Sequence, residues 1–163
     1  MKRILVNLFA SLSIVVAGSL CLQFDGWLTF SLPPVPEAVY WIFLTIGLGL
    51  IALAEATFLM RGGATGAPAD PTKHLVVFGI YRWLRNPIYL GGALVLLGVS
   101  LARHSPTLFL AAILFLPAMH LTVVRGEERR LEKDFGDEYL EYKRSVPRWI
   151  PRPPYLINMD RKK

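Results

Sequence analysis

Long apolar blocks, with most of the charged residues gathered between them, limit the folds open to this chain more than anything else in its sequence. Of its 163 residues, 53% are hydrophobic and only 18% are charged, whereas a soluble domain has about 25% charged residues. A core folded in water does not require this much apolar sequence, and long apolar blocks are typical of helices that cross a lipid bilayer. We therefore expect an all-α integral membrane bundle that forms one domain over residues 1–163.

The blocks predict about four transmembrane helices, at residues 4–24, 38–60, 87–102 and 107–124. The first block follows a charged start, as in a signal peptide, but it is long enough to span a membrane and no small-residue cleavage site precedes Asp25. We therefore interpret it as a retained helix. At ~1.5 Å per residue the third block reaches only ~24 Å, short of the ~30 Å hydrocarbon core. It predicts either a thin crossing or one arm of a tight hairpin.

The distribution of lysine and arginine predicts the orientation, because positive residues are retained on the cytoplasmic side of a membrane. Lys2 and Arg3 precede the first block, and the loop that follows this block has no basic residue. The next loop and the region after the fourth block are both basic, and Arg103 is the one discordant charge. We expect both termini in the cytoplasm.

A polar helix is predicted at residues 127–145, after the last apolar block. Its apolar residues recur every three or four positions and form one stripe, which consists of Leu131, Phe135, Tyr139, Tyr142 and Val146. We expect this cytoplasmic amphipathic helix to lie flat against the membrane surface or against the other helices.

Several function classes find no support in the sequence. Cys21 is the only cysteine, so one chain can form neither a disulfide framework nor a cysteine-based metal cluster. There is no GxGxxG after a strand, no Walker sequence and no HExxH, so Rossmann, P-loop and zinc-protease interpretations have no motif behind them. The net charge of +6 does not indicate a nucleic-acid partner, because the basic residues lie at the ends of apolar blocks.

The segment from Gly79 to Gly91 is the first candidate for chemistry. Asn86 and Pro87 are a common way to begin a helix, as N-cap and first helical residue, and this role requires no function. The functional interpretation rests on the aromatic and arginine residues around them. A helix start near the cytoplasmic surface leaves amide protons unpaired, and together these groups could hold an anionic or aromatic cofactor.

Glu127 and Glu128, just beyond the fourth block, are the second candidate. The helix dipole favours acidic residues in a first turn without any function. As a functional pair they would accept hydrogen bonds from an ammonium group and balance the basic residues nearby. Both interpretations stay open at this point.

Two further ionisable residues, Glu55 and His120, fall inside apolar blocks. Placing such groups in lipid is costly, so we expect them to face the bundle interior or a wet cavity. Both lie toward the cytoplasmic ends of their helices, where a side chain can also reach the interface. They are candidates to line a substrate pocket. The alternative is that their side chains only reach the interface between the membrane and water.

Taken together, these stretches resemble the integral membrane methyltransferases of the isoprenylcysteine carboxyl methyltransferase and phospholipid methyltransferase group. The similarity covers roughly the second half of the chain, and the ordered set of motifs is more specific than any one of them. The matching stretches are Lys73 to Val76, Gly79 to Gly91, Glu127 to Leu131, Phe135-Gly136, Tyr139, Tyr142 and Val146 to Pro151.

The resemblance implies an enzyme that binds S-adenosylmethionine without a Rossmann domain, at the cytoplasmic edge of the last two membrane helices. It implies that Glu127 holds the methionine ammonium group, with Glu128 close behind. The other residues implied to surround the cofactor are Lys73, His74, Leu75, Val76, Tyr81, Arg85, Asn86, Pro87, Ile88 and Tyr89. The isoprenylcysteine enzymes have histidine where this chain has Asn86, and their substrate arginine falls near Val123. The resemblance therefore supports the cofactor more than a prenylated acceptor.

The implied reaction is methyl transfer, by direct displacement, to a lipophilic or small hydrophobic acceptor or a lipid at the cytoplasmic membrane face. No catalytic residue is assigned, although an ammonium acceptor must first lose a proton and Glu55 or His120 would assist that step. One alternative is a nicotinamide-dependent membrane reductase, because some sterol reductases resemble the same region. Another is a non-catalytic membrane protein that keeps the scaffold.

Overall fold

The computed structural model describes residues 22–28, 30–57, 60 and 75–153. These residues form helices and connecting segments, with no β-strand among them, so the all-α class is confirmed for this part of the chain. The α-helices are α2 (Glu37–Thr57), α3 (Pro87–Ala102), α4 (Pro106–Thr122) and α5 (Glu128–Ser145). The short turns η1 (Asp25–Trp27) and η3 (Gly79–Arg82) are 3-10 helices, and η4 (Val123–Glu127) is a π-helical turn. The predicted helix at 4–24 lies outside the described residues except for its last three positions.

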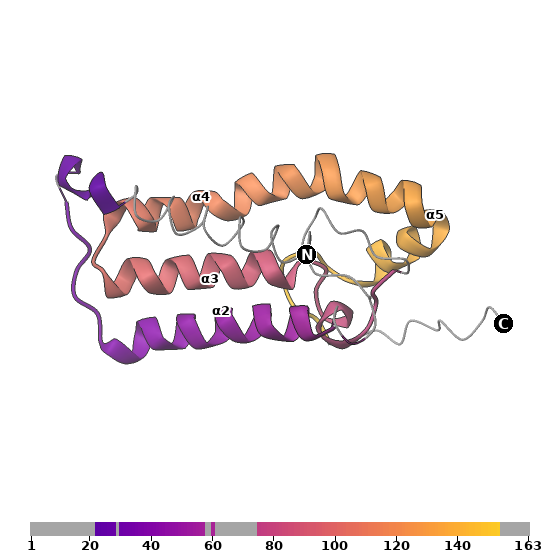
Figure 1. Ribbon diagram of the computed structural model, residues 1–163, viewed down its shortest axis with the longest axis horizontal. Coiled ribbons are helices and arrows are strands. Elements are labelled where there is room, and N and C mark those ends of the chain that lie inside the picture. Colours follow the sequence, from indigo (N-terminus) through magenta and orange to yellow (C-terminus); the bar gives the residue numbers. More distant parts are fainter. Residues whose placement is uncertain (1–21, 29, 58–59, 61–74, 154–163) are drawn as a thin grey trace, which may run out of the picture.

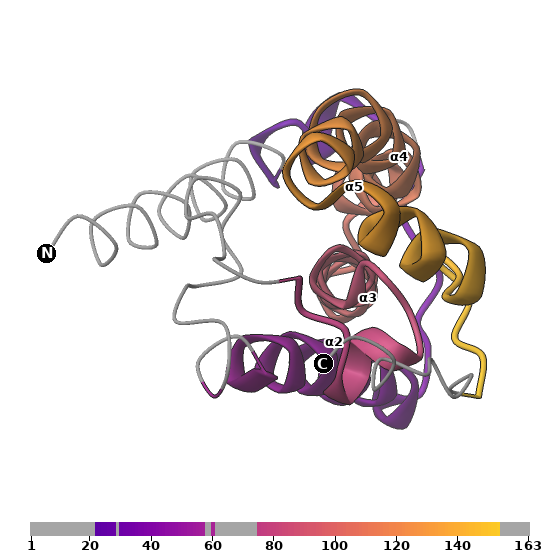
Figure 2. The same ribbon diagram turned by 90° about the vertical axis from the view of Figure 1, so that its right-hand side faces the viewer.

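The helices α2, α3 and α4 lie side by side (Figures 1 and 2) and alternate in direction (Figure 1). By length and hydropathy, α2 and the helix that runs from Pro106 to Ser145 can cross a membrane, and α3 is a shorter apolar helix. Large apolar side chains stay exposed on α2 and α4, among them Trp41, Ile46 and Leu114. Lipid covers such a surface without the penalty that water imposes. These features support a membrane protein, while the count of four crossings and the orientation of the termini stay predictions.

Small residues allow α2 and α3 to approach at backbone distance. A Cβ atom on Gly47 would lie 2.7 Å from the carbonyl oxygen of Gly91, and a Cβ atom on Gly91 would lie equally close, at 2.7 Å, to the carbonyl oxygen of Gly47. Further along, a Cβ atom on Gly98 would lie 2.8 Å from the side chain of Leu44. No side chain fits between the two helices at these points.

The helix α3 begins and ends at the residues that the sequence predicts. Asn86 is its N-cap residue and Pro87 its first residue, where a fixed φ suits the helix and a missing amide proton costs nothing. At its other end, His104 turns the chain with a φ of 51°. The hydroxyl of Ser105 then accepts a hydrogen bond from the Leu108 amide at 3.2 Å and caps α4.

The turn between α3 and α4 is also held from the amino-terminal side of the chain. Asp25 Oδ1 accepts hydrogen bonds from the Ser105 hydroxyl (2.8 Å), the Thr107 amide (3.1 Å) and the Thr107 hydroxyl. Burial opposes ionisation of this carboxyl group, but the three hydrogen bonds outweigh it and lower the pKa of Asp25 below its ordinary value. The contact joins η1 to the end of the bundle that lies away from α5 (Figure 1).

The helices predicted at 107–124 and 127–145 are not separate, which corrects the expected break between them. The π turn η4 carries the helical path from α4 directly into α5. The sharp change of direction comes later, at Gly136, whose φ of 52° and ψ of −128° are open to glycine because it has no Cβ atom. Beyond Gly136 the chain turns back toward the start of α3 (Figure 1).

Candidate functional site

A pocket of about 240 Å³ lies between the first turn of α3 and the junction of α4 with α5. Tyr89 forms the α3 wall. The other wall consists of Thr122, Gly126, Glu127 and Arg130. This volume is below the ~300–1,000 Å³ of pockets that enclose a whole drug-sized ligand, so these walls surround one part of such a molecule.

Tyr89 and Glu127 meet inside this pocket. The Tyr89 hydroxyl donates a hydrogen bond to Glu127 Oε2 at 3.3 Å. The two residues are separated by the rest of α3 and all of α4 in the sequence, and the antiparallel arrangement of these helices brings them together. This proximity is the one that a shared cofactor site at these two residues requires.

The adjacent residues Glu127 and Glu128 have different surroundings. Glu127 ends the π turn and lines the pocket. Glu128 begins α5 and is only 4% exposed. π turns within α-helices are rare and are frequent at functional sites. Here the turn lies between the apolar α4 and the polar α5 and carries the residue that meets Tyr89.

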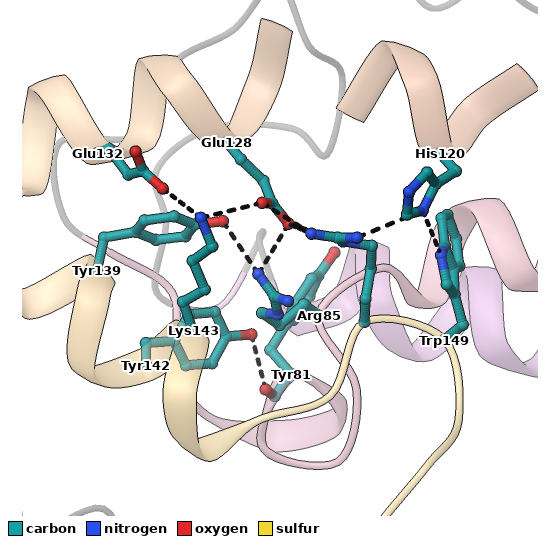
Figure 3. A network of polar contacts seen from close by, with 10 residues as sticks. Tyr81, Arg85, His120, Glu128, Glu132, Tyr139, Tyr142, Lys143 and Trp149 are labelled. Atoms are coloured by element: carbon teal, nitrogen blue, oxygen red, sulfur yellow. Dashed lines mark hydrogen bonds and ion pairs between the residues drawn. The ribbon is translucent and has the colours of Figure 1, made fainter. Parts of the chain in front are cut away.

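Three cationic side chains surround the carboxylate of Glu128 (Figure 3). Arg85 Nη1 donates to its Oε1 at 2.8 Å, and the Nζ atom of Lys143 lies 3.4 Å from its Oε2. Arg148 binds it in a bidentate manner, with Nε 2.8 Å from Oε1 and Nη2 2.9 Å from Oε2. Charge-assisted and bidentate hydrogen bonds of this kind are among the strongest in proteins. Glu128 therefore connects the start of α3, helix α5 and the chain beyond it.

Residues 146–152, which we name the C-terminal strap, cross from α5 to the segment before α3. The Arg85 amide donates to the carbonyl oxygen of Pro147 at 2.9 Å, and the Arg152 amide donates to that of Trp83 at 3.1 Å. Val146, 1% exposed, packs with Tyr139 and Tyr142 in a buried cluster that Leu75, Val77, Leu131 and Phe135 surround. The predicted apolar stripe of α5 thus packs against the protein itself, and its position relative to a membrane stays a prediction.

Tyr81 lies in a buried cluster with Ala54 and Val76. Its carbonyl oxygen accepts a hydrogen bond from the Tyr142 hydroxyl at 2.8 Å. Burial raises the pKa of the Tyr81 phenol, and the nearby Tyr142, Glu55 and Glu127 raise it further. The phenol therefore stays protonated, and the two carboxyl groups lie within electrostatic reach of it.

The remaining predicted site residues fall into three groups. Asn86, Pro87 and Ile88 form the start of α3, where the Asn86 side chain makes no capping hydrogen bond and is 9% exposed. Val76 belongs to the buried cluster of Tyr81, and Leu75 packs against the buried cluster of Tyr139, Tyr142 and Val146. Lys73 and His74 lie outside the described residues.

His120 is not among the residues that line this pocket, and its predicted place in a separate substrate pocket stays a prediction. Its Nδ1 atom lies 3.2 Å from the indole Nε1 of Trp149 and 3.3 Å from Nη1 of Arg148 (Figure 3). Glu55 is half-buried on α2. Within the described residues, no three His, Cys, Asp or Glu side chains are grouped as a metal ion would require.

Three pocket residues on one side of the α4–α5 helix were not predicted as site residues: Thr122, Gly126 and Arg130. Their spacing of four carried the signal, because such residues share one face of a helix. The strap residues Arg148 and Trp149 were also missed as part of this network. Their partners Glu128 and His120 are far away in the sequence, and no local pattern reports such a contact.

Comparison with known proteins gives one family match. Residues 44–138, more than half of the chain, match the model of the phospholipid methyltransferase family. The matched region contains the pocket walls and ends within α5, before the C-terminal strap.

Individual relatives give a similar result. The chain is 28% identical over 139 residues to a human protein named protein-S-isoprenylcysteine O-methyltransferase. The aligned region covers 78% of this chain and 49% of the human protein. A Schizosaccharomyces pombe protein of the same name is 26% identical over 144 residues, or 82% of this chain and 57% of its own length. The cobalt-zinc-cadmium resistance protein CzcN of Cupriavidus metallidurans is 29% identical over 109 residues, 67% of this chain and 50% of its own length. The chain thus spans about half the length of the curated relatives it matches.

Proposed function

Because this chain belongs to the phospholipid methyltransferase family, we propose that it transfers a methyl group from S-adenosylmethionine to a lipophilic acceptor at the cytoplasmic face of a membrane. The pocket between α3 and the α4–α5 junction would hold the methyl donor. The observation that carries this proposal is the hydrogen bond in the wall of that pocket, where the Tyr89 hydroxyl lies 3.3 Å from Glu127 Oε2.

The chemistry of the pocket walls fits the amino-acid end of the donor. Glu127 offers a carboxylate for an ammonium group, and Arg130 offers a guanidinium group for a carboxylate. The Tyr89 hydroxyl lies against Glu127 and orients it. Since the volume of about 240 Å³ accommodates only part of the donor, we assign this pocket to the methionine portion.

Glu128 has a different part in this proposal from the one that the resemblance implied. Both of its oxygens are occupied by hydrogen bonds from Arg85 and Arg148. We therefore assign the contact with the donor to Glu127 and a structural role to Glu128. Arg85 belongs with Glu128, because its Nη1 atom is 2.8 Å from that carboxylate.

When bound, the donor supplies an electrophilic methyl group on a sulfonium. The residues of this chain would bind and align the donor, and the apolar surface of α4 would exclude water from one side. Alignment of the reactants and exclusion of water can supply much of the rate enhancement of such a displacement. Leu121, which precedes the pocket residue Thr122 in the sequence, is 51% exposed on α4. An apolar acceptor can therefore approach along α4 from the lipid, while the polar donor enters from the aqueous side.

The name of the human relative and the S. pombe relative specifies an isoprenylcysteine as the acceptor of those proteins. For this chain we propose the broader class of lipophilic acceptors, which includes lipids and small hydrophobic molecules. Purified protein incubated with labelled S-adenosylmethionine and a total lipid extract should yield a labelled lipophilic product, identified by mass spectrometry. Absence of any labelled product would contradict a transfer to lipids.

Binding of the donor is tested by isothermal titration of the protein with S-adenosylhomocysteine and with NADPH. We expect heat with the first ligand alone, and the family match does not favour the reductase alternative. Glu127→Gln should weaken the binding of S-adenosylhomocysteine by roughly 10-fold or more, because a hydrogen bond to a charged group contributes about 1.5–3 kcal/mol. Glu138→Gln, at an exposed position of α5, is the matched control. Heat with NADPH alone, or equal affinity in the Glu127→Gln protein, would refute the proposal.

A further inference from the structure

We infer that His120 is a positioning residue, which anchors the C-terminal strap to α4 and so holds together the two walls of the pocket. The inference rests on the proposed function, because it concerns how the proposed donor site keeps its shape. It gives His120 a role different from that of a residue in contact with substrate.

The strap is attached to the α3 side of the pocket by backbone hydrogen bonds. The Arg85 amide donates to Pro147, and the Arg152 amide donates to Trp83. Arg85 lies two residues before α3, whose first turn carries Tyr89. A displacement of the strap would therefore move the start of α3 and, with it, the wall that Tyr89 forms.

The strap is attached to the opposite wall by side chains. Arg148 binds both oxygens of Glu128, which directly follows Glu127 in the sequence. The strap thus bridges the segment next to Tyr89 and the segment next to Glu127. Its position sets the distance between the two residues that carry the proposed function.

His120 fixes the strap at a third point, on α4. Its Nδ1 atom accepts a hydrogen bond from the indole of Trp149 at 3.2 Å and faces the Nη1 atom of Arg148 at 3.3 Å (Figure 3). Both neighbours are donors, so Nδ1 must carry a lone pair and the proton of the neutral ring belongs on Nε2. One acceptor atom therefore orients the same arginine that binds Glu128.

The essential feature of His120 is therefore the acceptor atom Nδ1 and not the ring. Asparagine offers a carbonyl oxygen near the position of Nδ1, whereas leucine offers a similar volume without an acceptor. His120→Asn should therefore preserve the anchor and His120→Leu should remove it. His104→Asn is the control, because His104 is exposed at the opposite end of α3 and asparagine tolerates its φ of 51°.

The first measurement is amide hydrogen exchange of residues 146–152 in the full-length protein, without any ligand. In the His120→Leu protein, the amides of Val146 and Arg152, which donate to Tyr142 and Trp83, should exchange about tenfold faster, because two hydrogen bonds that hold the strap are lost. His120→Asn and His104→Asn should leave the exchange unchanged. If His120→Leu does not accumulate in folded form, Trp149→Phe removes one of the same two hydrogen bonds and should accelerate exchange in the same segment.

The second measurement is the affinity for S-adenosylhomocysteine, which should fall about tenfold in His120→Leu and be restored in His120→Asn. Unchanged exchange in His120→Leu, or equal damage in His120→Asn, would overturn the inference. A wild-type protein that binds no S-adenosylhomocysteine would instead contradict the proposed function, and the exchange measurement would still decide whether His120 anchors the strap.

Discussion

Replacing Glu128 by glutamine should destabilise the protein far more than the same change at its neighbour Glu127. The substitution Glu128→Gln keeps the size of the side chain and removes the negative charge. Glu128 is 4% exposed and the side chain of Arg85 is 9% exposed, so water cannot replace the lost interaction. Arg85 and Arg148 would then lose the anion that both contact at 2.8 Å.

The expected magnitude follows from this burial. Breaking a buried ion pair by removing one partner costs about 3–5 kcal/mol, because the other charge is left without compensation. Lys143 adds little, since its side chain is 35% exposed and water screens it. For a chain of this length, such a loss lowers the unfolding temperature by roughly 6–20 °C. Glu127 is less buried than Glu128, and in Glu127→Gln the amide oxygen still accepts from the Tyr89 hydroxyl, which lies 3.3 Å from Glu127 Oε2, so less than about 1 kcal/mol should be lost.

The assay is thermal unfolding in detergent, in which the amount of monodisperse protein that remains after heating is measured. Titration with S-adenosylhomocysteine at a temperature where both proteins are folded is the companion measurement, in which Glu127→Gln should show the larger loss. Glu138→Gln controls for the loss of one acidic residue from α5. Equal unfolding temperatures for the two variants, or a lower one for Glu127→Gln, would refute the assignment of different roles to these adjacent glutamates.

Four other changes test separate parts of the structure. Gly126→Val should reduce the affinity for S-adenosylhomocysteine by roughly tenfold in a titration, without lowering the unfolding temperature, because an added Cβ atom meets nothing within 4 Å and the side chain projects from the pocket wall. Gly47→Ala should cost about 1–3 kcal/mol in thermal unfolding, since its Cβ atom would lie 2.7 Å from a backbone oxygen of α3; unchanged stability would mean that α2 and α3 are further apart. Tyr89→Phe should weaken S-adenosylhomocysteine binding about fivefold, as one hydrogen bond contributes about 1 kcal/mol, and equal affinity would exclude the hydroxyl from the site. Asp25→Asn should be less stable than wild type above the ordinary aspartate pKa of 3.8, and this difference should shrink as the pH falls through the lowered pKa of Asp25; a difference that grows in acid would contradict the contact with Ser105 and Thr107.

Local signals predicted the elements that depend on neighbouring residues. Asn86-Pro87 and the polar turn at Arg103 gave both ends of α3, because capping and proline placement act within a few residues. The proximity of Tyr89 and Glu127 also followed, since the alternating direction of apolar helices places both at one end of the bundle. The family resemblance supplied the expectation that they share a site.

Other features have no local signature. Glu127 and Glu128 are chemically identical neighbours, and only the fold decides that one lines the pocket and the other binds Arg85 and Arg148. The π turn was missed because the change from apolar to polar residues near Val124 resembles a helix end. The anchor at His120 depends on Trp149, a partner 29 positions away, and hydropathy alone places that histidine only inside an apolar block.

The contact between Gly47 and Gly91 determines which parts of the molecule can move when a ligand enters or leaves. With backbones this close, α2 and α3 behave as a single rigid body, because sliding or tilting one against the other would force their main chains to collide. We therefore expect any widening of the pocket to come from a movement of α4 and α5 relative to these two helices. The π turn, with its irregular hydrogen bonding, is a natural hinge for that motion, and the length of the C-terminal strap sets how far the hinge can open.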